Sequence, residues 1–182
     1  MSNKLKYLVV FNTCELKGSN LDWYIECLDN LLDADYENFD LAVSGCMLTD
    51  NTKKVLKEKY RDKLFLNFID CRLPVNITFN HTVNKVIEHV GRYDGYVYFD
   101  SGVNINDNKH YLKEIDERFS TGKYEMVSLQ TDTDTGFWIF GLHGYFYDHD
   151  YVVPVGKACN LHVTCFGDKL YSNIVKYYLI SF

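Results

Sequence analysis

The sequence predicts an α/β protein with a mostly parallel central sheet. Through the first hundred residues, short apolar segments of strand-like composition alternate with segments of helical periodicity, and this alternation is typical of βαβ units. Because such connections are right-handed crossovers, we expect the carboxyl ends of the strands at one edge of the sheet. The 182 residues contain only two prolines and no linker-like run, which indicates a single domain.

The chain opens with a buried strand and an amphipathic helix. Residues 5–12 form a continuous apolar run, which suits a strand that is buried on both faces. A turn at Gly18-Ser19-Asn20 follows. Apolar residues then recur at three-and-four spacing over residues 21–32, which predicts a helix, and Asn20 is in position to cap it.

Three more strands and two more helices are expected before Gly102. The strands cover residues 39–44, 64–69 and 96–99. One helix begins at Thr49-Asp-Asn-Thr52 and extends to about residue 60, and the other covers residues 78–90 and ends at Gly91. The last of these strands leads directly into Asp100.

The pattern changes after Gly102. We expect a helix over residues 111–119, an antiparallel pair of strands over residues 126–130 and 137–142, irregular aromatic chain from His143, and a final helix over residues 170–180. The sheet is therefore expected to have a smaller antiparallel part. Residues 1–182 would form one domain with two halves, residues 1–105 and residues 106–182.

Composition restricts the kind of partner. The formal net charge is −6, with basic and acidic residues interspersed, which argues against nucleic-acid binding because phosphate recognition needs a basic surface. Six cysteines occur without a C-x-x-C pair, a pattern that suits free thiols in a reducing compartment. No signal-peptide-like or membrane-spanning apolar run is present. We therefore expect a cytoplasmic protein.

Aromatic residues are numerous, with 15 Tyr and 12 Phe. Most of these rings are expected to fill the core. Some are free to stack on flat polar ligands such as bases and sugars.

Asp100 is the leading candidate for chemistry. Ligands of α/β sheets bind outside the carboxyl ends of the strands, and Ser101-Gly102 allows the backbone to approach a ligand closely. Asn80 and Asn84 lie one turn apart on the preceding helix, so their amides share a face. The alternative interpretation is that Asp100 only stabilises a turn.

The stretch from Asn84-Lys-Val-Ile87 to Tyr96-Val-Tyr-Phe-Asp100 resembles the Asn-bearing helix and Asp-ending strand of GT-A glycosyltransferases, especially family-two-like enzymes. Thr49-Asp50-Asn-Thr52 resembles the Ser-x-Asp-x-Thr stretch of the same enzymes. The resemblance covers roughly residues 5–105. It implies a GT-A (Rossmann-like) nucleotide-diphospho-sugar transferase fold, and transfer of a hexosyl or deoxyhexosyl group from a nucleoside diphosphate sugar to a hydroxyl of a glycan or other acceptor.

The resemblance also implies a set of donor-binding residues. Asp100 and Ser101 would lie at the metal and the diphosphate, and Asn84 near the donor. The base and ribose would contact Asn12, Thr13 and Asp50. Lys157 either contacts the diphosphate or is simply exposed.

The implied cofactor is Mn²⁺ or Mg²⁺, which take oxygen ligands and neutralise the leaving diphosphate. The second metal-facing Asp of the GT-A motif would fall at Gly102, so one carboxylate would be left, with Asp107 as a substitute. His162 is a further candidate ligand, because imidazole suits Mn²⁺. Alternatively it is a hydrogen-bonded core residue, and His143 and His149 are competing candidates.

An inverting transferase needs a carboxylate base for the acceptor hydroxyl. Asp132 and Asp134 fit first as turn residues of a hairpin, whereas Asp148 and Asp150 lie in an aromatic loop that suits an acceptor sugar. We therefore expect Asp150 or Asp148 to be the base. The sequence does not distinguish inversion from retention.

A different class of function is a non-catalytic nucleotide- or glycan-binding module on the same scaffold, because fold does not fix function. Other dinucleotide- or phosphate-binding folds are disfavoured, because neither G-x-G-x-x-G nor a Walker A sequence is present. Since 182 residues is short for the GT-A fold, the chain is expected to be either a minimal version of that fold or the first domain of a longer polypeptide.

Overall fold

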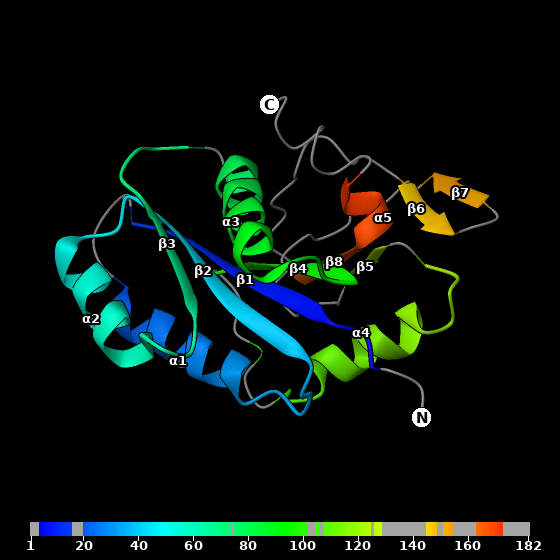
Figure 1. Cartoon of the computed structure of the whole chain (residues 1–182), viewed down its shortest axis with the longest axis horizontal. Coiled ribbons are helices and arrows are strands. Elements are labelled where there is room, and N and C mark those ends of the chain that lie inside the picture. Colours follow the sequence, from blue (N-terminus) through cyan, green and yellow to red (C-terminus); the bar gives the residue numbers. More distant parts are fainter. Residues whose placement is uncertain are drawn as a thin grey trace.

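The computed structural model describes residues 4–15, 20–73, 75–101, 105, 108–124, 126–128, 145–148, 151–154 and 163–172 (Figure 1). Its central sheet has six strands in the order β3-β2-β1-β4-β8-β5. They are β1 (Tyr7–Cys14), β2 (Phe39–Cys46), β3 (Phe65–Ile69), β4 (Gly95–Asp100), β5 (Met126–Ser128) and β8 (Val163–Gly167).

The sheet is mostly parallel, as predicted. Strands β1 to β4 run parallel to one another, and β8 runs antiparallel to both β4 and β5. A separate antiparallel ribbon pairs β6 (Tyr145–Asp148) with β7 (Tyr151–Pro154). The expected α/β architecture with a smaller antiparallel part is therefore confirmed.

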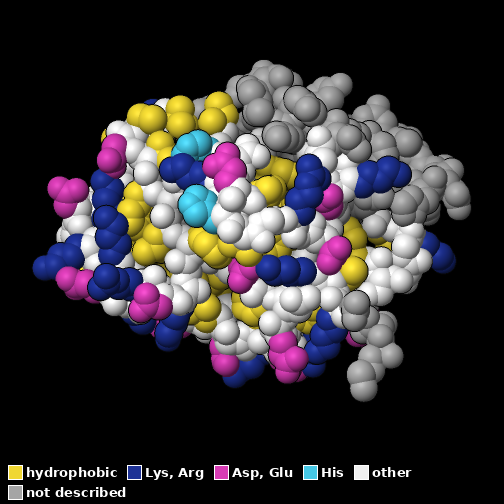
Figure 2. Space-filling view, in the orientation of Figure 1, with side chains coloured by type: hydrophobic (Ala, Val, Ile, Leu, Met, Phe, Trp, Pro, Cys, Tyr) yellow, Lys and Arg dark blue, Asp and Glu magenta, His cyan; other side chains and the backbone are white. Residues whose placement is uncertain are grey.

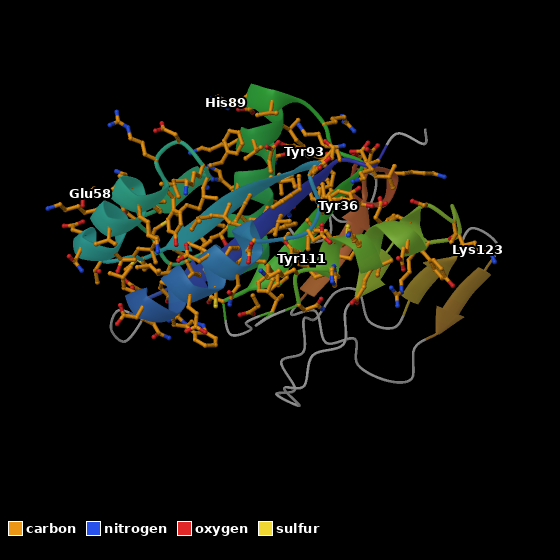
Figure 3. The ribbon with its side chains drawn as sticks, turned by 90° about the horizontal axis from the view of Figure 1, so that it is seen from below. Tyr36, Glu58, His89, Tyr93, Tyr111 and Lys123 are labelled. Carbon is orange, nitrogen blue, oxygen red and sulfur yellow. The ribbon has the colours of Figure 1, made fainter. Side chains whose placement is uncertain are left out.

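Helices cover both faces of the sheet (Figure 1). One face packs against α1 (Leu21–Leu32), α2 (Asp50–Tyr60) and α4 (Tyr111–Phe119), and the other against α3 (Val75–Val90) and the short α5 (Asp168–Leu170). The fully buried Tyr111 of α4 donates its hydroxyl to Leu31 O of α1 (3.4 Å), which joins these two helices beneath the sheet (Figure 3).

The period of two in β1 explains why its sequence is continuously apolar. Val9 and Phe11 belong to the core under α1, α2 and α4, whereas Leu8 and Val10 belong to the core under α3. Successive strand residues point to opposite faces, so a strand with helices on both sides buries every side chain. The prediction of a doubly buried first strand is confirmed.

The helix boundaries follow local signals. The Thr49 hydroxyl accepts a hydrogen bond from Thr52 N (3.2 Å) and caps α2. Gly91, with φ of 98°, ends α3. Asn20 precedes α1 as expected, and its carbonyl accepts from Tyr24 N (3.0 Å), but its side chain makes no capping bond with the residues that are described.

The second half departs from prediction. Residues 145–148, 151–154 and 163–167 are strands, where irregular chain was expected. For residues 163–167 the reason is long-range pairing: β8 inserts between β4 and β5 and buries Cys165 and Phe166, and no local pattern encodes such a partner.

Two more predictions from the second half are tested only in part. Strand β5 pairs with β8, and its expected partner at residues 137–142 lies outside the described residues. Of the expected helix at residues 170–180, only residues 170–172 are described. The assignment of residues 1–182 to one domain stays a prediction.

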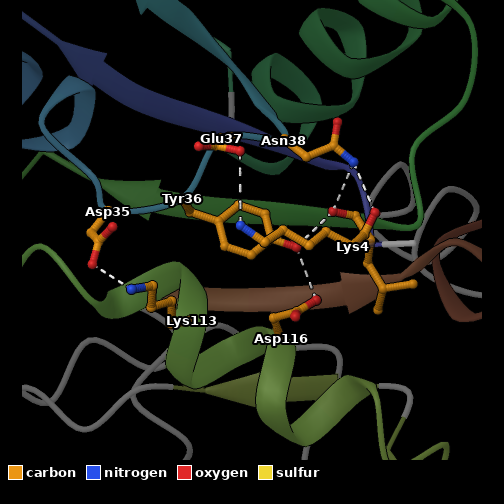
Figure 4. A network of polar contacts seen from close by, with 8 residues as sticks. Lys4, Asp35, Tyr36, Glu37, Asn38, Lys113 and Asp116 are labelled. Carbon is orange, nitrogen blue, oxygen red and sulfur yellow. Dashed lines mark hydrogen bonds and ion pairs between the residues drawn. The ribbon is translucent and has the colours of Figure 1, made fainter. Parts of the chain in front are cut away.

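A network of polar contacts lies at the amino-terminal edge of the sheet (Figure 4). The hydroxyls of Tyr7 and Tyr36 both donate to Asp116 Oδ1 (3.0 Å each), and Tyr36 also donates to Leu5 O (2.7 Å). The network ties β1 and the turn before β2 to α4, at the edge opposite the predicted ligand site.

Candidate functional site

A row of polar side chains crosses the carboxyl edge of the parallel strands. Asn12 of β1 lies beside Ser44 of β2 on one side and Asp100 of β4 on the other, and Ser44 lies beside Asn67 of β3. In-register neighbours in a parallel sheet point to the same face, and these four continue the face that carries Val10 and α3. The apolar core of that face therefore ends in a polar row at the carboxyl edge.

The junction between β1 and β4 differs from the other strand pairs in how the chain connects its strands. The chain builds outward from β1 to β2 and β3 and then returns to place β4 on the other side of β1. Strand order reverses at this point, and open α/β sheets bind ligands in the crevice there. Asn12 and Asp100 lie on its two sides.

Asn12 is buried and holds the two strands together at this junction. Its side-chain amide donates to Val10 O (2.9 Å) and to Phe99 O (3.3 Å). Its Oδ1 atom is buried without a hydrogen-bond partner among the described residues. Because an unpaired buried acceptor costs about 1–3 kcal/mol, this oxygen suits a bound water or ligand.

The turn after Asp100 is held from two directions. Ser101 N donates to Asn12 O (3.0 Å), and Trp23 Nε1 donates to Ser101 O (2.6 Å). Trp23 belongs to the first turn of α1. This contact joins residues 78 positions apart, and sequence reasoning missed it because no local pattern signals it.

Asp100 itself is partly exposed. The Tyr98 hydroxyl donates to Asp100 Oδ2 over a long 3.5 Å. Burial, followed by the nearby Asp100 carboxylate, raises the pKa of Tyr98 well above its usual value. Tyr98 therefore remains a hydrogen-bond donor toward the Asp100 carboxylate.

Glu15 is a buried acid at the same edge, and sequence reasoning did not single it out. Its carboxylate accepts from Thr49 N (2.7 Å) and from the Thr52 hydroxyl (2.8 Å). A carboxylate at a helix N-terminus is favoured by the helix dipole. Glu15 thus connects the end of β1 to the start of α2.

Asp50, predicted to contact the base or ribose, lies at the start of α2. Its side chain is fully exposed and pairs with Lys53 (3.7 Å). Thr13 is buried on the opposite face of the sheet from Asn12, close to Tyr24. The donor-contact roles of Asp50 and Thr13 stay predictions.

The two helix asparagines differ in depth. Helix α3 leaves the carboxyl edge after β3 and ends before β4 begins, so Asn80 lies one turn nearer that edge than Asn84. Asn80 is buried, and its Oδ1 accepts from the Tyr171 hydroxyl (2.9 Å), whereas its Nδ2 has no partner among the described residues. Asn84 is half-buried, and its donor-binding role stays a prediction.

A second polar network ties α3 to β3. Asn67 donates to the Thr82 hydroxyl (2.8 Å), contacts His81 Nδ1 (3.0 Å) and accepts from Lys85 Nζ (3.0 Å). Figure 2 shows histidine side chains over α3, with basic and acidic side chains beside them. Asn67 is the last residue of the polar row. Residues of α3 hold its side chain in place and provide its hydrogen-bond partners.

Three cysteines lie at this edge, and one of them, Cys14, has a raised pKa. Cys14 and Cys46 are register partners on β1 and β2, and Cys46 Sγ donates to Cys71 O (3.0 Å). Burial, reinforced by the neighbouring Cys46, raises the pKa of Cys14 to about 11. The described part of the chain contains only free cysteines.

A metal site is not complete within the described residues, where no group of three or more His, Cys, Asp or Glu side chains converges. The residues that are described do fit a hard cation in part. Asp100 offers a carboxylate and Asn12 an unpaired amide oxygen on the adjacent strand, and oxygen donors are what Mg²⁺ and Mn²⁺ take.

Several predicted site residues lie outside the described residues: Asp150, Lys157, His162 and the alternatives Asp107, Asp132, Asp134, His143 and His149. Asp148 is the last residue of β6, where its backbone pairs with Tyr151. Their roles stay predictions.

Surface hollows also occur away from this edge. One lies between α2 and β3 and is lined by Lys57, Glu58, Arg61, Leu64 and Leu66. Another lies at the amino edge, lined by Lys4, Glu37, Asn38 and Asp94. Both are wide open and carry long, flexible charged side chains, so the sheet topology rather than surface shape identifies the candidate site.

No protein-family model and no curated protein sequence matches the chain. Solved structures do. S. aureus TarS 1–349 aligns with a TM-score of 0.60 and 16% identity over 92% of this chain and 48% of that one. The mannosyltransferase PcManGT from Pyrobaculum calidifontis, in complex with GDP-Man and Mn²⁺, aligns with a TM-score of 0.62 and 14% identity over 94% of this chain and 47% of that one.

A putative nucleotide-diphospho-sugar transferase from Desulfovibrio desulfuricans G20 aligns with a TM-score of 0.52 and 11% identity, over 90% of this chain and 64% of that one. The chain thus has the GT-A glycosyltransferase fold, which confirms the resemblance drawn from its sequence. It spans about half the length of TarS 1–349 and of PcManGT.

Proposed function

We propose that the chain is a glycosyltransferase domain that moves a sugar from a nucleoside diphosphate sugar to a hydroxyl of a glycan or other acceptor. The observation that carries the proposal is the position of Asp100 beside Asn12, at the strand-order reversal of a GT-A fold. A hexosyl or deoxyhexosyl group is the proposed cargo. The free cysteines favour a cytoplasmic location.

The donor would bind along the carboxyl edge of β1, β2 and β4. Asp100 would hold Mn²⁺ or Mg²⁺ at the end of β4, next to Asn12 of β1. When bound there, the ion would neutralise charge on the leaving diphosphate. Ser101 and Lys157 are proposed at the diphosphate, and Asn84 near the donor. The proposed base and ribose contacts are Asn12, Thr13 and Asp50.

The acceptor side is proposed to use Asp150 or Asp148 as the base. Its carboxylate would take the proton of the acceptor hydroxyl while that oxygen forms a bond to the anomeric carbon. The bond from the anomeric carbon to the diphosphate oxygen breaks, and the nucleoside diphosphate leaves. His162 is proposed as a further ligand of the metal that Asp100 would hold.

A second candidate is a non-catalytic nucleotide- or glycan-binding module. It is favoured by the single carboxylate at the end of β4, since Gly102 stands where the GT-A motif has its second Asp. Such a module would bind the same donor class without transferring sugar. No helix among the described residues is long and apolar enough to cross a membrane, and both candidates accommodate that finding.

Thermal unfolding with a panel of nucleoside diphosphates and nucleotide sugars, each with and without Mn²⁺, tests the proposal. A ligand at 100 times its dissociation constant adds about 2.7 kcal/mol to the free energy of unfolding, which for this chain length raises the midpoint by roughly 5–10 °C. A Mn²⁺-dependent shift with one nucleotide class, followed by sugar transfer, supports the transferase. A shift without transfer supports the binding module, and no shift across the panel contradicts both.

A further inference from the structure

We propose that Trp23 is a positioning residue that holds the Asp100–Ser101 turn in its ligand-binding geometry. The proposal rests on the proposed donor site and adds to it a residue of α1 to which the resemblance assigned no role. The observation is the hydrogen bond from the indole Nε1 to the Ser101 carbonyl oxygen (2.6 Å).

Trp23 completes a clamp around the backbone of one residue, Ser101. Ser101 N donates to Asn12 O on β1 (3.0 Å), and Ser101 O accepts from Trp23. The residue just before, Asp100, pairs in register with Asn12. The backbone that carries the Asp100 carboxylate is therefore held by β1 on one side and by α1 on the other.

The clamp matters because the β4 ladder stops here. Asp100 is the last residue of β4 and Ser101 is a turn residue, and the Ser101 N–Asn12 O bond is the last one from this segment to β1 among the described residues. A turn without the indole contact would sample more conformations, and a ligand would have to order it on binding. Trp23 thus reduces the conformational entropy that is lost when the sugar donor binds.

Packing alone does not account for the arrangement. Trp23 is only partly buried against the core under α1, and that packing needs a large ring but no N–H group. The direction of the indole N–H toward Ser101 O is a separate property that can be removed while the ring stays. Loss of the N–H group alone therefore tests the hydrogen bond apart from the packing of the ring.

The test compares Trp23→Phe with Tyr60→Phe. Tyr60→Phe is the matched control, because the Tyr60 hydroxyl donates to Ile25 O (3.2 Å) and Asp29 Oδ1 (2.8 Å) on the same helix α1 without touching Ser101. Two quantities are measured for each variant: hydrogen–deuterium exchange of the Ser101 amide without ligand, and the dissociation constant for the nucleoside diphosphate with Mn²⁺. Substituting Trp23 by benzothienylalanine, which replaces the N–H by sulfur, provides a second variant that keeps the ring volume.

We expect loss of the N–H to speed exchange of the Ser101 amide and to weaken Mn²⁺-dependent binding, each by roughly threefold to tenfold. Tyr60→Phe should change neither quantity beyond its effect on global unfolding. Unchanged exchange, or faster exchange with unchanged affinity, overturns the positioning role while leaving the proposed function intact. If the wild-type protein binds no nucleotide, the proposed function fails and the positioning role fails with it, whereas the exchange data still report the clamp.

Discussion

Asn12 and Asp100 are register partners across the β1–β4 ladder, one on each side of the point where strand order reverses. The Asn12 amide donates to Phe99 O (3.3 Å), the carbonyl just before Asp100, and leaves its own Oδ1 without a partner in the described part of the chain. Two side chains that carry oxygen ligands thus lie on neighbouring strands where α/β sheets bind ligands. The proposed donor and metal site follows from this pair.

The polar network at the amino edge should support stability without serving the donor. Replacing Asp116 by Ala leaves the hydroxyls of Tyr7 and Tyr36 without their shared acceptor, so we expect a loss of about 2 kcal/mol in the free energy of unfolding. Denaturant unfolding measures it. Asp35→Ala is the control, because Asp35 makes exposed ion pairs with Lys113 and His110, and solvent screening leaves such pairs little effect on stability. Equal losses in the two variants would contradict this account.

Ser44 offers a test for a water or ligand inside the polar row. Its side chain is fully buried, and its hydroxyl has no partner among the described residues. If the hydroxyl is truly unpaired, Ser44→Ala should leave stability unchanged or raise it by up to about 1 kcal/mol, because an unsatisfied buried group is removed. Thermal and denaturant unfolding decide it. A loss above 1 kcal/mol would instead mean that bound water satisfies Ser44 in solution.

The thiol of Cys14 should react slowly despite its exposed position. Because its pKa is raised to about 11, it is protonated at neutral pH, and the thiolate is the nucleophile. The alkylation rate at Cys14, followed by mass spectrometry, should rise roughly tenfold per pH unit from pH 7 to pH 10. A plateau by pH 9 would show that the thiol ionises normally.

The raised pKa of Cys14 also determines how this thiol changes the free energy of unfolding with pH. The folded-state pKa of Cys14 exceeds the ordinary thiol value, so the folded state holds this proton more tightly than the unfolded state. Its contribution to stability is full below pH of about 8.5 and is lost as pH rises toward 11.

The first half of the fold was predictable because its signals are local. The apolar run in β1, the capping Thr49 and the terminating Gly91 each act within a few residues. The position of Asp100 at a strand end followed from the same patterns. Right-handed crossovers then placed the strand ends at one edge.

Strand β8 and several contacts at the candidate site depend on residues that are distant in sequence. Strand β8 is defined by pairing with β4 and β5, and five residues without that context read as loop. The contacts of Glu15 with Thr52 and of Trp23 with Ser101 link segments 37 and 78 residues apart. Such contacts emerge only once the sheet has brought those segments together.

The central claim is that the Asp100 carboxylate binds the donor through a divalent ion. Calorimetric titration of the nucleoside diphosphate, with and without Mn²⁺, into the wild-type protein and Asp100→Asn tests it directly. We expect the substitution to weaken binding by at least about tenfold with Mn²⁺, equivalent to roughly 1.4 kcal/mol, and to leave metal-free binding unchanged. Equal affinity of the two proteins in the presence of Mn²⁺ would contradict the account.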